Sequence, residues 1–413
     1  MKNSLIINRI KQGALLLMSA LIFVACTEDD MPALDPDEVL TGQSKSYDLD
    51  EVAVPGISGT AVLEETSTGS TKLTITLSGT PDGGQHPAHI HFNSAATGGG
   101  IAVSLTPVNG TTGISETIIS RQDDGSSLTY NQLLDFDGYI NVHLSADDLG
   151  TIVAQGDIGS NELTGETKTY TLNEADVDGI SGEIIFEERR NGFALATISL
   201  TGTPDGGVHP AHIHANSAAI GGGILFTFNP VNGTTGMSMT DTREGMMDGE
   251  EGYTYDEILE VDGYVNVHLS AEALATIVAQ GDIGSNELTG VSQTYPLAAV
   301  AVAGISGEIT FQERINGFAL ATITLVGTPV DGSHPAHIHE NSAAVGGGIL
   351  YTFNPVNGAT GVSISDTRQG MMDGEASYNY AQILTVDGYV NVHLSATELA
   401  TIVAQGDIGV NFE

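Results

Sequence analysis

The sequence predicts an all-β fold: three tandem antiparallel β-sandwich or Greek-key barrel-like domains, each with one short helix. The first observation behind this prediction is a pattern of about 120 residues that occurs three times along the 413-residue chain. The second is the composition, because 52 glycines, a 6% aromatic content and the lack of tryptophan suit turn-rich β-structure. The period sets the limits of the repeats, which we expect at residues 47–165, 170–290 and 295–413.

A targeting region precedes the repeats. Lys2, Arg9 and Lys11 form a basic start, and the apolar run after them is too short to span a bilayer. This order is typical of a secretory signal, and the sequence therefore predicts a lipoprotein signal peptide over residues 1–25.

Cys26 is the sole cysteine of the chain and follows Phe-Val-Ala, an order that resembles the bacterial lipobox. We expect Cys26 to be lipidated and to anchor the protein in the outer membrane; the alternative is a chance cysteine at a simple cleavage site. Residues 27–30 resemble the acidic tag that directs many Bacteroidetes lipoproteins to the cell surface. Residues 26–46 are expected to form an acidic flexible tether. The predicted location is therefore the cell envelope, with the repeats exposed at the surface.

The net charge limits the partners. The formal charge is −40, and loss of the signal would make it three units more negative. Such a field repels nucleic acid and anionic lipid headgroups and attracts cations, so we expect no nucleic-acid partner. An acidic coat for solubility outside the cell explains the charge equally well, and an extracellular protein or glycan partner stays open.

The early part of each repeat predicts a hairpin. In the second repeat, residues 183–189 and 193–200 are β-like runs on either side of Asn191-Gly192, a pair that favours tight turns between strands. A glycine-rich loop, an apolar strand and a second Asn-Gly turn follow later in the repeat. Many short strands with close turns predict antiparallel sheet throughout.

The end of each repeat predicts the short helix. Ser145 and Asp148 have the spacing of a capping box, while Ile152 and Val153 share a helical face that would stop at Gly156. The alternative is that this segment is the last strand of the repeat.

Every histidine of the chain lies at one of four positions in the repeat. Each repeat carries the string His-Pro-Ala-His-Ile-His and, more than 50 residues later, Asn-Val-His. The candidate metal ligands are His86, His89, His91, His143, His209, His212, His214, His268, His334, His337, His339 and His393.

Strand alternation brings these histidines together. His89 and His91 share one face of a strand, and Ile90 lies on the other face, toward the core. His143 alternates with aliphatic residues in the same manner, so it is expected on the outer face. A turn at Pro87 would swing His86 toward the same point.

Clustered imidazoles suit zinc or copper, whereas calcium and magnesium prefer oxygen ligands. Four histidines would close a tetrahedron, and three would leave an open position for water or substrate. We therefore predict up to one zinc or copper ion per repeat. The alternative is a network of structural histidines that hydrogen-bond across the sheet.

Three other groups recur in the repeats. One set of arginines would orient an anion near the metal or, as we favour, form ion pairs: Arg121, Arg243 and Arg368. Two methionine pairs would bind copper or, as we favour, pack: Met246-Met247 and Met371-Met372. One set of aspartates would occupy turns or caps or support a histidine ligand: Asp157, Asp282 and Asp407.

The repeats resemble the CHRD (chordin) family. The resemblance lies in His-Ile-His, the glycine-rich loop and the apolar strand, followed by Tyr-x-Asn-Val-His, and it covers residue 47 to the end of the chain. The usual ending of that family is replaced here by Ile-Val-Ala-Gln-Gly-Asp-Ile. The resemblance implies extracellular β-domains that act as binding modules.

The His-x-His strand with a later strand histidine is also similar to copper-zinc superoxide dismutase, a Greek-key barrel with copper ligands on its outer face. This similarity implies a copper redox centre, although the repeat has too few histidines for a separate zinc site. Three functions follow from the sequence: an envelope-anchored metal-binding module, a dismutase-like enzyme, and a metal-free structural or adhesive repeat protein. We favour the first and leave open whether the protein is an enzyme, which would then be an oxidoreductase of the superoxide dismutase type.

Overall fold

The computed structural model describes residues 38–247, 249, 251–372 and 376–412. The predicted signal peptide over residues 1–25 and Cys26 lie outside the described residues. Residues 40–46, which the sequence assigns to a tether, belong to the first strand. Within the described part of the chain, no helix combines the length and apolarity needed to cross a membrane.

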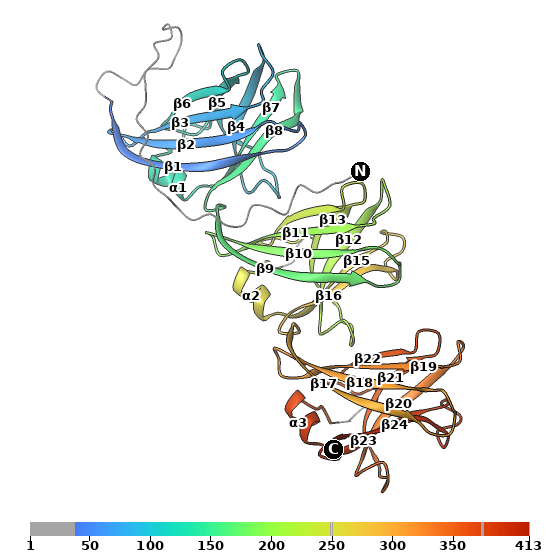
Figure 1. The fold of residues 1–413 in the computed structure, drawn as a ribbon. Helices are drawn as coiled ribbons and strands as arrows, with labels where there is room; N and C mark the ends of the chain where they lie inside the picture. Colours follow the sequence, from blue (N-terminus) through green and yellow to red (C-terminus); the bar gives the residue numbers. More distant parts are fainter. Residues whose placement is uncertain (1–37, 248, 250, 373–375, 413) are drawn as a thin grey trace.

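Eight antiparallel strands form the first domain, a closed barrel (Figure 1). Its elements are β1 (Leu40–Glu51), β2 (Ser58–Thr66), β3 (Thr71–Ser78), β4 (Gln85–Phe92), β5 (Ile101–Asn109), β6 (Ile114–Ile119), α1 (Tyr130–Leu134), β7 (Asp137–Ser145) and β8 (Asp148–Gly159). The strand order is β1-β2-β3-β6-β5-β4-β7-β8, so β4 crosses the end of the barrel to lie between β5 and β7. The predicted Greek-key type of barrel is confirmed.

The second domain repeats this barrel with the same order of strands. Its elements are β9 (Leu163–Glu174), β10 (Ser181–Arg189), β11 (Ala194–Thr201), β12 (Val208–Ala215), β13 (Ile224–Asn232), β14 (Met237–Asp241), α2 (Tyr255–Glu260), β15 (Asp262–His268) and β16 (Ile277–Gly284). The predicted hairpin about Asn191-Gly192 is confirmed, because β10 pairs with β11.

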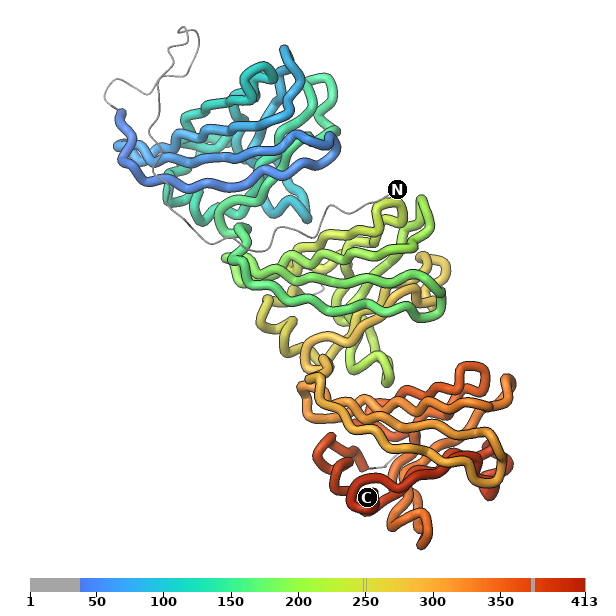
Figure 2. The backbone as a smooth tube through the Cα atoms, in the orientation of Figure 1, coloured from blue at the N-terminus to red at the C-terminus, as the bar shows by residue number. Residues whose placement is uncertain are grey.

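The third domain is an eight-stranded sheet with the same neighbours, read from β21 to β22. Its elements are β17 (Leu288–Ala299), β18 (Ser306–Arg314), β19 (Ala319–Val326), β20 (Ser333–Glu340), β21 (Ile349–Asn357), β22 (Val362–Asp366), α3 (Tyr380–Thr385), β23 (Asp387–His393) and β24 (Ile402–Gly409). The three domains follow one another along the molecule (Figure 2). The gaps that the sequence analysis left between repeats, at 166–169 and 291–294, fall within β9 and β17.

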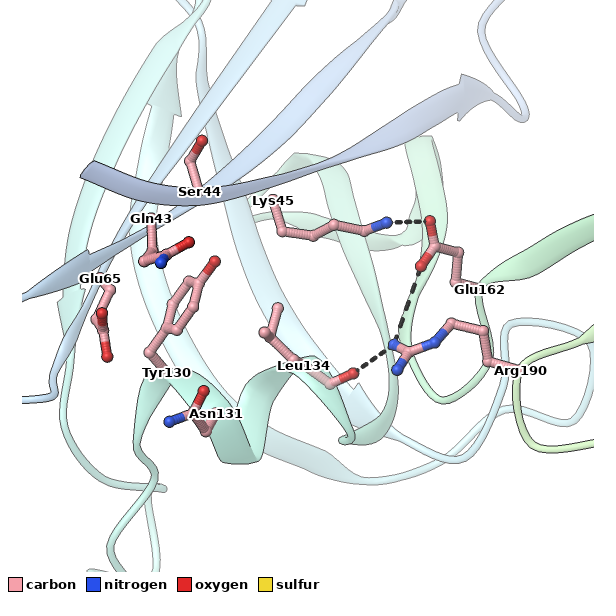
Figure 3. Close-up of a pocket in the computed structure, with 9 residues that line it drawn as sticks. All are labelled: Gln43, Ser44, Lys45, Glu65, Tyr130, Asn131, Leu134, Glu162 and Arg190. Atoms are coloured by element: carbon pink, nitrogen blue, oxygen red, sulfur yellow. Dashed lines mark hydrogen bonds and ion pairs between the residues drawn. The ribbon is translucent and has the colours of Figure 1, made fainter. Parts of the chain in front are cut away.

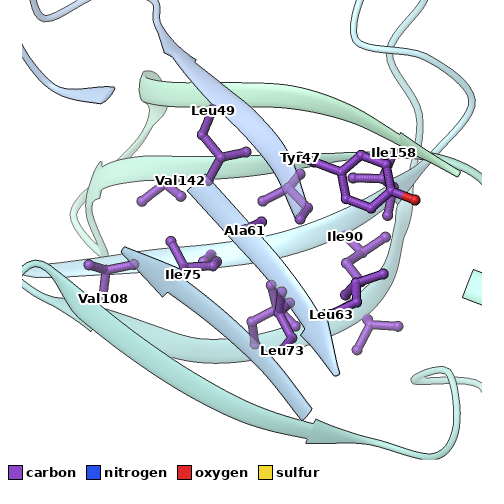
Figure 4. Close-up of a cluster of buried hydrophobic side chains, with 14 of the residues drawn as sticks. Tyr47, Leu49, Ala61, Leu63, Leu73, Ile75, Ile90, Val108, Val142 and Ile158 are labelled. Carbon is purple, nitrogen blue, oxygen red and sulfur yellow. The ribbon is translucent and has the colours of Figure 1, made fainter. Parts of the chain in front are cut away.

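Each domain has its own apolar core. In the first domain Ala61, Leu63, Ile75, Ile90 and Val142 are at most 1% exposed and converge inside the barrel (Figure 4). Along β3 the buried residues alternate with more exposed ones, as a strand with one core face requires. The opposite, outer face of each sheet is therefore left to polar side chains.

The prediction of a helix over residues 145–156 is wrong. The segment is β8, which pairs with β7 along its length and with β1 through Asp50 and Glu51, and thereby closes the barrel. Gly156 does not stop a helix; a Cβ atom there would lie 2.1 Å from the carbonyl oxygen of Asp48, so glycine permits the close approach of β1. The single short helix of each domain precedes β7 instead, and a capping box of Thr129 and Gln132 starts it in the first domain.

Candidate metal centre

Three histidines of each domain converge on the outer face of the barrel. β4 pairs with β7, with His89 opposite Asn141 and His91 opposite Tyr139. His89 and His91 therefore lie on the same face as His143, while Ile90 is fully buried in the core. One ligand atom from each histidine lies within 4.8 Å of the others in all three domains: His89, His91 and His143; His212, His214 and His268; His337, His339 and His393. We call each such set a triad.

Backbone carbonyls orient two rings of each triad. In the first domain Nδ1 of His91 donates to the oxygen of Gly99 at 2.9 Å, and Nδ1 of His143 donates to the oxygen of Leu149 at 2.7 Å. The second and third domains repeat both bonds, to Gly222 and Leu274 and to Gly347 and Leu399. Because Nδ1 carries the proton in these rings, Nε2 is left with its lone pair facing the other histidines.

In the second and third domains the nitrogens that face one another have unused lone pairs, whereas in the first domain Nδ1 of His89 and Nε2 of His143 share a hydrogen bond at 3.0 Å. In the second domain Nδ1 of His212 and Nε2 of His214 and His268 are buried and have no hydrogen-bond partner among the described residues; the third domain repeats this with His337, His339 and His393. Such orphaned buried atoms are uncommon in proteins. A nitrogen-preferring cation would bind all three at once, so the residues present fit a zinc or copper ion.

Burial lowers the pKa of two histidines in each triad and so favours their uncharged form. Burial, followed by repulsion from the neighbouring imidazoles, lowers the pKa of both His212 and His337 to about 4. The same burial lowers the pKa of His89, and the Asp123 carboxylate partly opposes that effect. A neutral imidazole is the form that binds a metal, so these sites do not have to lose a proton before binding at pH 7.

The first histidine of each string, which is the fourth candidate ligand of its repeat, lies apart from the triad. β4 begins at Gln85, so His86 is inside the strand and shares the inner face with Ala88 and Ile90, only 1% exposed. Its Nδ1 donates to the backbone oxygen of His143 at 3.2 Å, and His209 and His334 make the same bond. The expected swing of His86 toward the other three is therefore not seen.

A tyrosine supports the His91 ring. Tyr139 stacks on His91 with ring centroids 5.0 Å apart and an interplanar angle of 20°, and its hydroxyl accepts from the backbone nitrogen of Gly99 at 3.2 Å. Gly99 also needs to be glycine, because a Cβ atom there would lie 2.1 Å from the oxygen of Phe92. Sequence reasoning missed this role, although Asp-Gly-Tyr recurs in every repeat.

The repeated arginines form ion pairs away from the triads. Arg243 pairs with Asp241 at 3.0 Å and with Asp137 of the preceding domain at 2.8 Å, and Arg368 pairs likewise with Asp366 and Asp262. The ion-pair interpretation of these two arginines is confirmed. Arg121, in the first domain, forms an isolated β-bridge with Ser127 instead.

The methionine pairs do not pack in the core. Met246, Met247, Met371 and Met372 are between 55% and 62% exposed, so the expected packing role is wrong. Both pairs nevertheless run beside a triad, because the nitrogen of Met246 donates to the oxygen of Thr227 and Thr227 lies opposite His212 in the sheet.

An antiparallel Greek-key barrel with a cluster of three imidazoles on its outer face defines a class: a β-barrel protein with a candidate copper or zinc centre. No family model matches the chain, and no solved structure matches it. One segment is 33% identical over 102 residues to the cell surface superoxide dismutase (Cu-Zn) 4 of Candida albicans, covering 23% of this chain. The chain spans 44% of the length of that relative.

Proposed function

We propose that this chain is an envelope-anchored metal-binding protein in which each of three barrels holds one copper or zinc ion through its triad. The observation that carries the proposal is the convergence of three ring nitrogens in each domain, which in the second and third domains are buried and have no hydrogen-bond partner among the described residues. Lipidation at Cys26 would hold the barrels at the outer membrane, and binding-module behaviour of the CHRD type remains part of this proposal.

The donor set favours copper or zinc over harder cations. Three nitrogens supply the donors of each triad, and among the described residues no carboxylate belongs to these groups. Three protein ligands leave one side of a bound ion open, the arrangement of sites that exchange water or bind a further molecule. His86 lies on the inner face of β4 and would have to turn to the outer face to bind the same ion. We therefore propose three ligands per ion and not four.

Elemental analysis of the purified mature protein, equilibrated with zinc or with copper and then desalted, tests this proposal. We expect three ions per chain, and none after substitution of His89, His212 and His337 by alanine together. A parent chain that retains no metal would rule out both the binding proposal and the enzymatic one, and would favour a metal-free structural repeat protein.

A matched control separates three ligands from four. Substitution of His86, His209 and His334 by asparagine keeps an N–H donor for the carbonyl of His143 and its equivalents but removes Nε2. We expect this variant to keep three ions per chain. Loss of metal from a folded variant would instead mean that His86, His209 and His334 also bind the metal.

Superoxide dismutation is the second candidate function. The similarity to a cell surface superoxide dismutase (Cu-Zn) supports it, together with the open side of a three-imidazole site. Copper bound there would supply the change of oxidation state that the reaction requires. The chain itself contributes the imidazoles, but Arg243 and Arg368, two of the three repeated arginines that would guide an anion, are in ion pairs elsewhere.

The copper-loaded chain tests this second function. If the protein is a dismutase, superoxide consumption should exceed that of free copper in the presence of a chelator, and it should disappear in the alanine variant of the three triads. Stoichiometric copper without turnover would exclude the enzyme and leave the binding function intact.

A further inference from the structure

The second and third domains each have an arginine that is buried at the junction with the preceding domain. Arg189, the last residue of β10, is 1% exposed and forms an ion pair with Asp157 of the first domain at 2.8 Å. It also donates to the backbone oxygen of Asn161 at 3.2 Å. A buried guanidinium requires partners of this kind, because desolvation without them costs several kcal/mol.

The two partners of Arg189 hold the loop that supports a triad. Asp157 accepts from the backbone nitrogen of Ala95 at 2.8 Å, and Asn161 donates to the backbone oxygen of Asn93 at 2.9 Å. Ala95 and Asn93 belong to the loop between β4 and β5, and the backbone oxygen of Gly99 in this loop accepts the hydrogen bond from Nδ1 of His91. A continuous path of polar contacts therefore runs from the second domain to a candidate metal ligand of the first.

The second junction repeats this path. Arg314 of the third domain pairs with Asp282 at 2.7 Å and donates to the oxygen of Asn286 at 2.8 Å. Asp282 accepts from Ala218, and Gly222 at the end of the same loop accepts from His214. At both junctions the same series of contacts therefore connects the arginine with a histidine of the triad in the preceding domain.

The outer rim of the junction is repeated only in part: the pair of Lys45 and Glu162 recurs as Lys168 and Glu287, but the contact of Arg190 does not recur. At the first junction Arg190 donates to the oxygen of Leu134 at 2.7 Å and Lys45 pairs with Glu162 (Figure 3). Ile315 occupies the position of Arg190 at the second junction. The buried arginine is therefore among the contacts that both junctions share, together with the lysine–glutamate pair, whereas the contact of Arg190 belongs to the first junction alone.

The third domain has the same acceptor but no arginine on it. Asp407 accepts from Ala343 at 2.7 Å and Gly347 accepts from His339, as in the other domains. Among the described residues, no arginine or lysine forms an ion pair with Asp407. The triads of the second and third domains have matching geometry, since the His212 and His268 rings and the His337 and His393 rings both have centroids 4.9 Å apart, and the two domains differ in this contact.

We infer that Arg189 and Arg314 are positioning residues for the metal sites of the preceding domains. By fixing Asp157 or Asp282, each arginine holds the loop whose glycine carbonyl orients one histidine of the triad. The inference rests on the proposed metal binding. It means that the junctions between domains set the affinities of the first two sites, while the third site has no such support.

The test uses full-length chains that keep a single triad. One chain carries His89→Ala and His337→Ala and keeps the second triad; its counterpart carries His89→Ala and His212→Ala and keeps the third. Zinc affinity is measured by competition with a chelating dye. We expect Arg314→Ala to weaken the second site by about 10- to 100-fold, the usual effect of losing a group that supports a ligand. The zinc affinity of the third site should not change with Arg314→Ala. It should be about as low as the affinity of the second site in the Arg314→Ala chain.

Two variants guard against a general folding defect. Asp282→Asn keeps an oxygen for Ala218 but removes the charge partner of Arg314, so it should weaken the second site and leave the third alone. Arg314→Lys should restore part of the affinity that Arg314→Ala loses. Equal affinities of the second site with and without Arg314, or equal loss at both sites, would overturn the inference. A parent chain that binds no zinc would contradict the proposed function itself.

Discussion

The triad of the first domain differs from the other two although all three lie on equivalent strands. His89 has its Nδ1 3.0 Å from Nε2 of His143, and the nearby Asp123 opposes the fall of its pKa. His212 and His337 are 7% and 6% exposed, and the pKa of each is lowered to about 4. The segment that follows the sixth strand carries Asp123 in the first domain and exposed methionine pairs in the others.

The difference shows which part of the site is variable. The strands fix the number and direction of the imidazoles, because the same residues pair across the sheet in each domain. The segment beside the site sets how strongly the imidazoles resist protonation, through burial and through charge. Three copies of one ligand set are therefore expected to respond differently to acid.

Acid should release metal from the first domain before the others. Protonation of an imidazole competes with the metal and costs affinity by about tenfold per pH unit below the pKa of that imidazole. His89 is less buried than His212 and His337, and the Asp123 carboxylate also favours its protonated form, so we expect His89 to be the first of the equivalent histidines to accept a proton as pH falls. Single-triad chains loaded with zinc and dialysed at a series of pH values will show the order, and release of all three at one pH would contradict this account.

The metal-free protein should lose stability on mild acidification. Histidines of the unfolded chain titrate near pH 6.5, whereas the folded pKa of His212 and His337 is about 4. The unfolded state therefore binds more protons between these values, and the free energy of unfolding falls as pH drops through this window; above it these groups have no effect. The thermal unfolding midpoint, measured with a chelator present, will show the fall.

A double variant separates the contribution of His212 and His337 to the acid sensitivity from that of the many carboxylates. In the chain with His212→Asn and His337→Asn, the unfolding midpoint should depend less on pH between about pH 6.5 and pH 4 than in the parent. Identical slopes in the parent and the variant would mean that the depressed histidines do not cause the acid sensitivity.

Removal of the Asp123 charge should make the first site more like the other two. Asp123 accepts hydrogen bonds from the backbone nitrogen and hydroxyl of Ser104, and its carboxylate stabilises the protonated form of His89. Asp123→Asn is therefore expected to lower the pKa of His89 further. The shift is small because the carboxylate is exposed to solvent, and NMR titration of the histidine ring protons measures it; a rise of the His89 pKa would contradict the assignment.

Alternation along the strands was enough to predict the triads. His89 and His91 on one face, with Ile90 in the core, follow from the period of two residues. The same rule places His86 on the inner face, three residues before His89, once the strand is known to begin at Gln85. Pro87 lies inside β4 and does not break the strand, so the prediction that a turn at Pro87 brings His86 to the other three histidines is wrong.

The junctions between domains could not be derived from one repeat. Arg189 and Asp157 belong to different domains, so no pattern within a single repeat pairs them. A signal was present, because Arg189 and Arg314 recur at one position where the first repeat has Thr66. The helix expected near Gly156 failed for a similar reason: the need to close the barrel, a tertiary effect, outweighed a local capping pattern.

X-ray diffraction at the absorption edge of the bound metal tests the central claim most directly. In crystals of the mature protein loaded with zinc or copper, we expect one anomalous peak in each barrel. Each peak should lie about 2.0–2.1 Å from Nδ1 of His89 and Nε2 of His91 and His143, or from their equivalents. Peaks elsewhere, or metal-equilibrated crystals without a peak at any triad, would contradict the assignment of these histidines as a metal centre.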